Sequence, residues 1–285
     1  MAQLLDGKAL SQTIRGEIRQ EVERLAAKGV TPRLSVILVG SDPASVTYTR
    51  MKKKACEKLG MISDLIVFPE DARQEEIEQK IDSLNADPSV HGIMVQHPVP
   101  RHLDELAILS RVSVAKDVDG ISSHSLGNLC LGTADFVSCT PLGIVTMLER
   151  YDIPIEGKKA VVIGRSIILG KPVALALLER NATVTICHSR TRELPEIIGQ
   201  ADIVVAAIGK PEFIKGEWIK DGAVVVDAGY NKVEGRDHDV GDVEYEEAAK
   251  RASWITPVPG GVGPMTITML LWQTLKSAKK AAGER

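Results

Sequence analysis

The chain has 285 residues, of which 35 are basic and 38 acidic, and its formal net charge is −3. This near balance provides no overall field for nucleic acid or an anionic membrane, so we expect neither as a partner. The N-terminus lacks a charged-then-apolar signal pattern, and no stretch of about 18 uninterrupted apolar residues occurs. We therefore expect a soluble protein without a targeting segment, long enough for two domains.

The four cysteines are Cys56, Cys130, Cys139 and Cys187. They form no C-x-x-C pair, and no histidine lies near them at zinc-finger spacing, so we expect no metal site. Reduced, mostly buried thiols are typical of cytoplasmic proteins, and we expect this location.

The first half of the chain alternates short β-branched runs with helical patterns after an amphipathic stretch at residues 8–28. This alternation predicts βαβ units. The strands are expected at residues 34–39, 64–67 and 92–96, and the helices at 44–59 and 74–84.

The second half begins after an irregular stretch at residues 116–140, where small residues crowd together and predict a loop-rich crossing between domains. Helices are expected at residues 141–150 and 173–178, and strands at 159–164, 183–187, 203–207, 223–228 and 254–256. A last helix, from 265 to about 282, has an apolar face that can pack back on the first domain. The sequence thus predicts an α/β fold with a first domain at 1–139, completed by the helix at 265–285, and a second domain at 140–264.

A glycine turn follows the strand that ends at Ile163. Gly164 and Gly170 bracket it in G-x5-G spacing, rather than G-x-G-x-x-G, and an apolar helix comes next. Such a turn exposes backbone N–H groups and a positive helix end to a phosphate. A tight strand-to-helix turn without a ligand is the alternative interpretation.

The end of the next strand favours NADP over NAD. An NAD enzyme carries an acid about 20 residues beyond the glycines, which binds the ribose 2′-hydroxyl. Here residues 187–192 read CHSRTR. Arg165, Ser189 and Arg190 are available to hold a 2′-phosphate, and no acid repels it.

Tyr48 and Lys52 lie four residues apart on one face of the helix that follows the first strand. A tyrosine can hydrogen-bond a lysine amine, and the neighbouring Arg50, Lys53 and Lys54 should favour the neutral amine that proton transfer needs. A solvated Tyr/Lys pair on a basic helix face is the alternative.

Gln96 ends a strand at the edge where α/β sheets bind ligands, and its amide can reach the lysine, or else it caps the loop before Pro98. The loop at residues 116–120 offers the carboxylates of Asp117 and Asp119, which suit an aminopyrimidine edge but also suit an ordinary turn. Residues 256–266 contain three prolines and three glycines, a rigid segment that lets backbone approach a ligand or that simply links the domains.

These segments together resemble the bifunctional methylenetetrahydrofolate dehydrogenase/methenyltetrahydrofolate cyclohydrolase family, often called FolD, over nearly the whole chain. The most specific matches are residues 257–266 (PVPGGVGPMT), the loop 116–120 (KDVDG), Cys139-Thr140-Pro141 with Gly143, and Gly164-Arg165-Ser166 with Gly170 and Pro172. The resemblance implies an N-terminal α/β catalytic domain and a C-terminal Rossmann-like NADP-binding domain with a cleft between them that holds the substrate. It also implies a homodimer formed through the second domain and a place in one-carbon metabolism and purine biosynthesis.

The resemblance also implies the site residues. Lys52, Tyr48 and Gln96 would be the catalytic residues. Lys52 would be central, Gln96 would tune it, and Tyr48 would stack beside the folate ring and share hydrogen bonds with it. Asp119, Pro259 and Gly260 would bind the tetrahydrofolate substrate, with Asp119 anchoring the pterin. Gly164, Arg165, Ser166 and Ser189 would hold NADP, and Tyr230 and Thr266 would line its nicotinamide side.

The implied reaction transfers a hydride from the methylene carbon to NADP and then hydrolyses the methenyl product to 10-formyltetrahydrofolate. Three residues depart from the family pattern: His97 replaces a leucine, Ser125 an asparagine, and Tyr230 an isoleucine. A dehydrogenase without cyclohydrolase activity and a nucleotide-binding protein without turnover are the competing interpretations. Accumulation of the methenyl product would identify the first.

Overall fold

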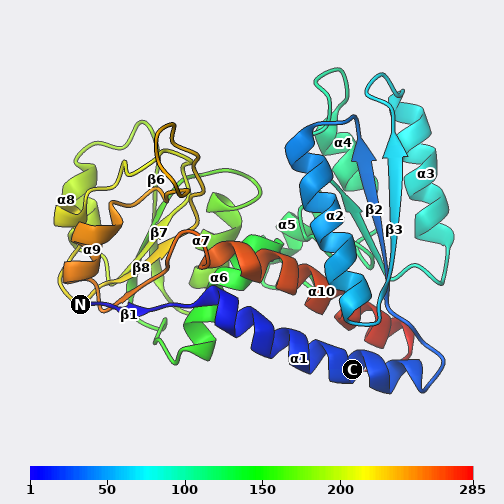
Figure 1. Ribbon diagram of the computed structural model, residues 1–285, viewed down its shortest axis with the longest axis horizontal. Coiled ribbons are helices and arrows are strands. Elements are labelled where there is room, and N and C mark those ends of the chain that lie inside the picture. The colour runs from blue at the N-terminus through cyan, green and yellow to red at the C-terminus, as the bar shows by residue number, and fades with distance from the viewer. Residues whose placement is uncertain (285) are drawn as a thin grey trace. The chain divides into compact units, whose positions relative to one another are not determined.

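The computed structural model describes residues 1–284, which divide into two compact units. Unit 1 comprises Met1–Gln12 and Thr140–Thr266, and unit 2 comprises Thr13–Cys139 and the chain from Ile267 onward. Each unit contains its own parallel sheet with helices around it (Figure 1). The predicted α/β fold class with two domains is confirmed.

Unit 2 contains a three-stranded parallel sheet in the order β3-β2-β4. Its strands are β2 (Arg33–Val39), β3 (Ile62–Phe68) and β4 (Gly92–Val95). The central strand β2 is buried almost throughout, as expected for a parallel strand that is covered on both faces. This explains its apolar residues from Val36 to Val39.

The helices of unit 2 follow the strands. They are α2 (Pro43–Lys58), α3 (Gln74–Ala86), α4 (Glu105–Arg111) and α5 (Ser123–Cys130), with most of α1 (Gly7–Ala26) and α10 (Val262–Ala281). The Asp42 carboxylate accepts a hydrogen bond from the Ser45 N–H at 2.8 Å and caps α2. The predicted irregular stretch at 116–140 contains α5, because the Ser122 hydroxyl caps that short helix in a segment rich in small residues.

Unit 1 contains a six-stranded parallel sheet in the order β1-β9-β8-β7-β5-β6. Its strands are β1 (Gln3–Leu4), β5 (Lys159–Ile163), β6 (Thr183–Cys187), β7 (Ile203–Ala206), β8 (Val224–Asp227) and β9 (Trp254–Ile255). The first twelve residues were expected in the first domain. They group instead with unit 1, because Gln3 and Leu4 pair with Trp254 and Ile255.

The helical elements of unit 1 are α6 (Cys139–Arg150), α7 (Gly170–Leu178), α8 (Leu194–Ile198), the 3-10 turn at Gly216–Trp218 and α9 (Tyr245–Arg251). Side chains of the strands, such as Ile163, Val204 and Val225, pack with Ile214 and Ala248 in a buried cluster. This core supports the carboxyl ends of β5, β7 and β8, where ligands bind in open α/β sheets.

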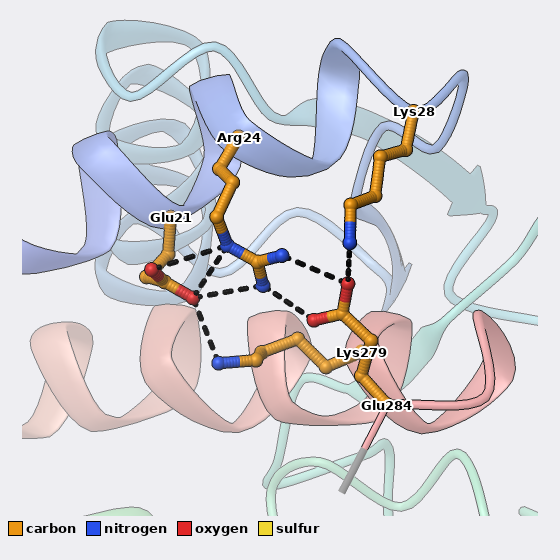
Figure 2. Close-up of polar contacts among 5 residues, drawn as sticks. All are labelled: Glu21, Arg24, Lys28, Lys279 and Glu284. Atoms are coloured by element: carbon orange, nitrogen blue, oxygen red, sulfur yellow. Dashed lines mark hydrogen bonds and ion pairs between the residues drawn. The ribbon is translucent and has the colours of Figure 1, made fainter.

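A charged cluster links α1 to α10 within unit 2 (Figure 2). The Arg24 guanidinium contacts the carboxylates of Glu21 and Glu284, Lys28 contacts Glu284 at 2.7 Å, and Lys279 contacts Glu21 at 2.7 Å. Hydrogen bonds from Arg24 and Lys28 lower the pKa of the Glu284 carboxyl to about 2. The end of α10 is therefore attached to α1 through ion pairs at the surface.

Cys56, Cys139 and Cys187 are buried, Cys130 is exposed, and all four are free thiols. Burial raises the pKa of the Cys56 thiol to about 12, so this group stays protonated at neutral pH. Within residues 1–284, no group of three or more potential ligands is arranged to hold a metal ion. In the same range, no helix is long and apolar enough to cross a membrane.

Candidate active site

Lys52 is a buried lysine of unit 2. Its side chain extends from the inner face of α2, and the residue is only 9% exposed. The amine donates a hydrogen bond to the Gln96 Oε1 at 3.0 Å and lies 3.4 Å from the Met94 Sδ. Burial lowers the pKa of this amine, and the nearby Asp119 and Cys139 partly oppose that effect. An amine shifted in this direction can exchange protons closer to neutral pH than an exposed lysine can.

Gln96 is held by both ends of its amide. Its backbone N–H donates to the Ile37 carbonyl at 2.8 Å, which continues the pairing of β4 with β2. The side-chain Nε2 donates to the His97 carbonyl at 2.8 Å, so the Oε1 is oriented toward Lys52. The His97 carbonyl thus fixes which end of the amide meets the lysine.

Tyr48 lies one turn before Lys52 on α2 but has a different environment. It is 45% exposed, whereas Lys52 is buried, and no hydrogen bond joins the two side chains within the described part of the chain. The tyrosine ring is therefore available to a ligand. The cause of the lysine's pKa shift also differs from the one that the sequence suggests, because burial rather than the adjacent Arg50, Lys53 and Lys54 lowers it.

The two acids of the loop at residues 116–120 have different partners. Asp117 is buried, and its carboxylate accepts hydrogen bonds from the Gly120 N–H at 3.1 Å, the Ser122 N–H at 3.1 Å and the Ser125 hydroxyl at 2.6 Å. Asp117 thereby closes the turn that carries Asp119. The Asp119 carboxylate acts electrostatically on Lys52.

Cys139 is a member of this constellation that the sequence reasoning did not assign. Its thiol is fully buried and lies 3.4 Å from the Val118 carbonyl. Burial, reinforced by the charge of Asp119, holds the pKa of this thiol well above its ordinary value. The matched segment at residues 139–143 contained it, but a lone cysteine gave no signal of its position beside Asp119.

The turn between β5 and α7 requires its two glycines. Gly164 has φ +131°, and a Cβ there would lie 2.2 Å from the Ala207 carbonyl oxygen. A Cβ on Gly170 would lie 2.4 Å from the Gly164 carbonyl oxygen. The Ser166 hydroxyl accepts hydrogen bonds from the Leu169 and Gly170 N–H groups, each at 3.2 Å, at the start of α7. The main chain at residues 164–170 therefore forms a tight turn at the N-terminus of α7, and we call this turn the cradle. Its shape fits the pyrophosphate of a dinucleotide.

The loop after β6 offers cationic and hydroxyl side chains. His188 and Thr191 hold the loop together, since the His188 N–H donates to the Thr191 Oγ1 at 2.8 Å. Ser189 and Arg190 are exposed, as is Arg165 of the neighbouring turn. The loop from 187 to 192 contains no acid, so the residues present fit a nucleotide with a 2′-phosphate.

Two buried carboxylates organise the loops after β7 and β8. Asp242 accepts hydrogen bonds from the N–H groups of Ile208, Gly209 and Lys210, and Asp227 accepts them from those of Gly229, Asp242 and Val243. Burial raises the pKa of Asp227 to about 6. From the sequence, Asp227 and Asp242 were given no role, because the backbone groups that they bind come from several separate segments.

Tyr230 follows this network and is 53% exposed, with its hydroxyl donating to the Asp239 carboxylate. Thr266 lies in unit 1 and shares a hydrogen bond with the Thr140 hydroxyl at 3.0 Å. The Gly260 carbonyl accepts from the Lys8 N–H at 2.8 Å, which attaches the 257–261 loop to the start of α1. Pro259, next to it, is exposed.

The structure therefore sorts the expected site residues into two groups. Unit 2 holds Tyr48, Lys52, Gln96 and Asp119. Unit 1 holds Gly164, Arg165, Ser166, Ser189, Tyr230, Pro259, Gly260 and Thr266. The geometry defines an α/β protein with a dinucleotide-type turn in one unit and a buried lysine site in the other.

Comparison with known proteins identifies the family. The catalytic-domain model of the tetrahydrofolate dehydrogenase/cyclohydrolase family matches residues 5–119, and its NAD(P)-binding-domain model matches residues 138–282. The chain belongs to this family. It is 55% identical over 282 residues to the bifunctional protein FolD of Acidobacterium capsulatum, with 98% of each chain covered.

Solved structures of relatives share the fold. The bifunctional FolD enzyme of Campylobacter jejuni superposes with a TM-score of 0.96 at 47% identity, covering 98% of this chain and 99% of that one. The Trypanosoma brucei FolD enzyme, solved with NADP and an inhibitor, superposes with a TM-score of 0.93 at 39% identity, covering 99% and 98%.

Proposed function

We propose that this chain is a bifunctional enzyme that oxidises 5,10-methylenetetrahydrofolate to 5,10-methenyltetrahydrofolate with NADP and then hydrolyses the product to 10-formyltetrahydrofolate. The observation that carries the proposal is the buried Lys52 amine, bonded to Gln96 and adjacent to Asp119, in a chain of the dehydrogenase/cyclohydrolase family. Burial disfavours the charged form of a lysine, so a buried lysine costs stability. Proton transfer at a reacting centre is a function that explains its presence here.

The dehydrogenase step uses the cradle of unit 1. Gly164, Arg165, Ser166 and Ser189 would hold the phosphates of NADP, while Tyr230 and Thr266 would line its nicotinamide side. The bound cofactor would supply the hydride acceptor for the methylene carbon. The exposed Arg165 supports a preference for the 2′-phosphate, since a guanidinium binds phosphate oxygens through charge-assisted hydrogen bonds.

The folate is bound by residues of different kinds. The exposed ring of Tyr48 stacks on it, and the Asp119 carboxylate accepts hydrogen bonds from the aminopyrimidine edge of the pterin. Pro259 and Gly260 supply backbone contact from a rigid loop. These assignments predict that substitution at Asp119 raises the KM for the folate more than that for NADP.

The hydrolytic step uses Lys52. Water attacks the cationic methenyl carbon, and the tetrahedral adduct opens as a C–N bond breaks and a formyl group remains on the other nitrogen. The Lys52 amine accepts a proton from the attacking water, and the resulting ammonium donates it to the departing nitrogen as the C–N bond breaks. The hydroxyl of the adduct releases its proton to solvent as the formyl C=O forms, so one proton is released overall. Gln96 orients the amine through its Oε1 during both transfers.

We further propose a cytoplasmic homodimer that supplies formyl groups for purine biosynthesis. Four free cysteines, three of them buried, support a reducing location. Strand β6 lies at the edge of the unit 1 sheet with Ile186 exposed, and Leu178 at the end of α7 is exposed as well. An edge strand with apolar side chains is suited to pairing with a second copy.

The experiment is a spectrophotometric assay with methylenetetrahydrofolate and either NADP or NAD. Reduced cofactor is followed directly, and the methenyl chromophore is followed at the reaction pH, because an acid quench would cyclise 10-formyltetrahydrofolate back to the methenyl form. We expect reduction of NADP with little methenyl product remaining. Persistent methenyl product would leave a dehydrogenase alone, and a preference for NAD would contradict the roles given to Arg165 and Ser189.

A further inference from the structure

Four polar side chains form a stripe on the final helix. They are Gln273, Lys276, Ser277 and Lys280 of α10. Their spacing places them on one face of the helix. The Ser277 hydroxyl donates to the Ala115 carbonyl at 3.0 Å, and the Lys276 amine donates to the Asp135 carbonyl at 2.5 Å. This face of α10 therefore binds the main chain of two loops of unit 2, one before Asp119 and one before Cys139.

Gln273 is the buried member of the stripe and uses both ends of its amide. The residue is 2% exposed. Its Oε1 accepts from the Val137 N–H at 2.9 Å, and its Nε2 donates to the Val118 carbonyl at 2.7 Å and the Val137 carbonyl at 2.9 Å. The same Nε2 lies 3.5 Å from the Cys139 Sγ. One side chain thus joins the residue before Asp119 to the segment that leads into α6.

The two loops also touch each other directly. Gly120 has φ +65°, and a Cβ there would lie 2.4 Å from the Val137 carbonyl carbon. Both neighbours of Asp119 are therefore fixed. Val118 accepts a hydrogen bond from Gln273. Gly120 packs against Val137, whose carbonyl also accepts a hydrogen bond from Gln273. Buried amides with this many partners define a single arrangement, because any shift leaves a polar group unsatisfied.

We propose that Gln273 is a positioning residue for the folate site, which fixes Asp119 relative to Lys52 from the distant C-terminal helix. This inference rests on the proposed function, in which Asp119 binds the pterin and Lys52 transfers protons. The polar contacts of Gln273 are with the backbone of Val118 and Val137 and with the Cys139 Sγ. It acts through the two loops, so its loss displaces Asp119 while the nucleotide cradle of unit 1 keeps its own supports.

A displacement of Asp119 would also change the pKa of the Lys52 amine. The charged and titratable groups that act on its amine are Asp119 and Cys139, while Gln96 and Met94 contact it as neutral groups. Asp119 raises the pKa of Lys52 against the larger effect of burial. A displaced Asp119 therefore lowers that pKa further, and the acid limb of the hydrolysis pH profile moves to lower pH.

The test compares Gln273→Met, which is similar in size but cannot hydrogen-bond as an amide, with Gln273→Asn, which keeps the amide but shortens its reach. Thr274→Val is the matched control, because Thr274 is buried on the same helix and bonds only within it, to the Leu270 carbonyl at 2.8 Å. Each variant is measured for the KM of the folate substrate, the KM of NADP, kcat, and the pH profile of methenyl hydrolysis. Thermal unfolding reports the folded fraction.

We expect Gln273→Met to raise the folate KM on the order of ten- to a hundredfold, as misplaced binding groups do, with the KM of NADP unchanged. Gln273→Asn should give a smaller rise in the folate KM. In both variants the acid limb of the pH profile should move to lower pH. A loss of folded protein alone would lower kcat and leave both KM values and the pH profile unchanged, and that result would overturn the inference. The same KM values and pH profile in Gln273→Asn and Thr274→Val would overturn it as well. An inactive wild-type chain would overturn the proposed function itself, and this inference with it.

Discussion

The two units hold their functional groups in different ways. In unit 1 the nucleotide turn is shaped by backbone, since Gly164 and Gly170 allow main-chain atoms to approach where any Cβ would collide. In unit 2 the site is shaped by side chains that converge from α2, β4 and a loop onto Lys52. A backbone cradle fails when a side chain is added, whereas a side-chain site fails when one is removed.

The largest effect is expected from removing the lysine of unit 2. Lys52→Met should lower the rate of methenyl hydrolysis about 10²- to 10⁴-fold, the usual contribution of a positioned acid–base group. Lys54→Met is the control, because Lys54 is an exposed lysine on the same helix. Turnover of both variants is followed by loss of the methenyl chromophore. Equal rates in the two variants would remove Lys52 from the mechanism.

A smaller effect is expected from adding a side chain to the cradle of unit 1. Gly164→Ala places a Cβ 2.2 Å from the Ala207 carbonyl oxygen at φ +131°. A strain of about 1–3 kcal/mol should weaken NADP binding roughly five- to 150-fold, as measured by fluorescence titration. Gly16→Ala, where a Cβ meets no atom within 4 Å, should leave NADP affinity unchanged and stabilise α1 by about 0.5–1 kcal/mol. Unchanged NADP affinity in Gly164→Ala would contradict the backbone account.

The smallest effect is expected at the surface cluster of Figure 2. The pKa of Glu284 is depressed to about 2, so its contribution to stability is present above the ordinary carboxyl pKa and is lost as the pH falls toward 2. Glu284→Gln should lower the melting temperature slightly at neutral pH and low salt, and the difference should vanish near 1 M salt, where screening acts over about 3 Å. Glu23→Gln, an exposed acid of α1, is the control. A difference that persists at high salt would mean that packing rather than charge is responsible.

The sequence predicts the cradle better than the buried site. A glycine turn between an apolar strand and an apolar helix is a local pattern, so Gly164 and Gly170 could be found without knowing what lies near them. The pair of Tyr48 and Lys52 was also visible, but the burial that lowers the lysine pKa was not, because it depends on residues distant in sequence, such as Met94 and Gln96, that meet the amine. The basic neighbours in the sequence suggested a different cause for the same direction of shift.

The supporting residues could not be read from the sequence for a related reason. Gln273 bonds to Val118, 155 positions earlier, and Asp242 gathers backbone groups from the loop after β7. A single amide among the apolar residues of the last helix was the available signal for Gln273, and it indicates only that a buried partner must exist. The α/β class, by contrast, follows from the alternation of apolar runs along the chain.

The proposed proton transfer by the buried Lys52 amine during hydrolysis is measured best by the pH–rate profile of methenyl hydrolysis. We expect the rate, corrected for spontaneous hydrolysis, to rise through an apparent pKa below the ordinary lysine value of about 10.4. Lys52→Met should lack this limb. The same limb in the wild type and in Lys52→Met would mean that another group transfers the proton.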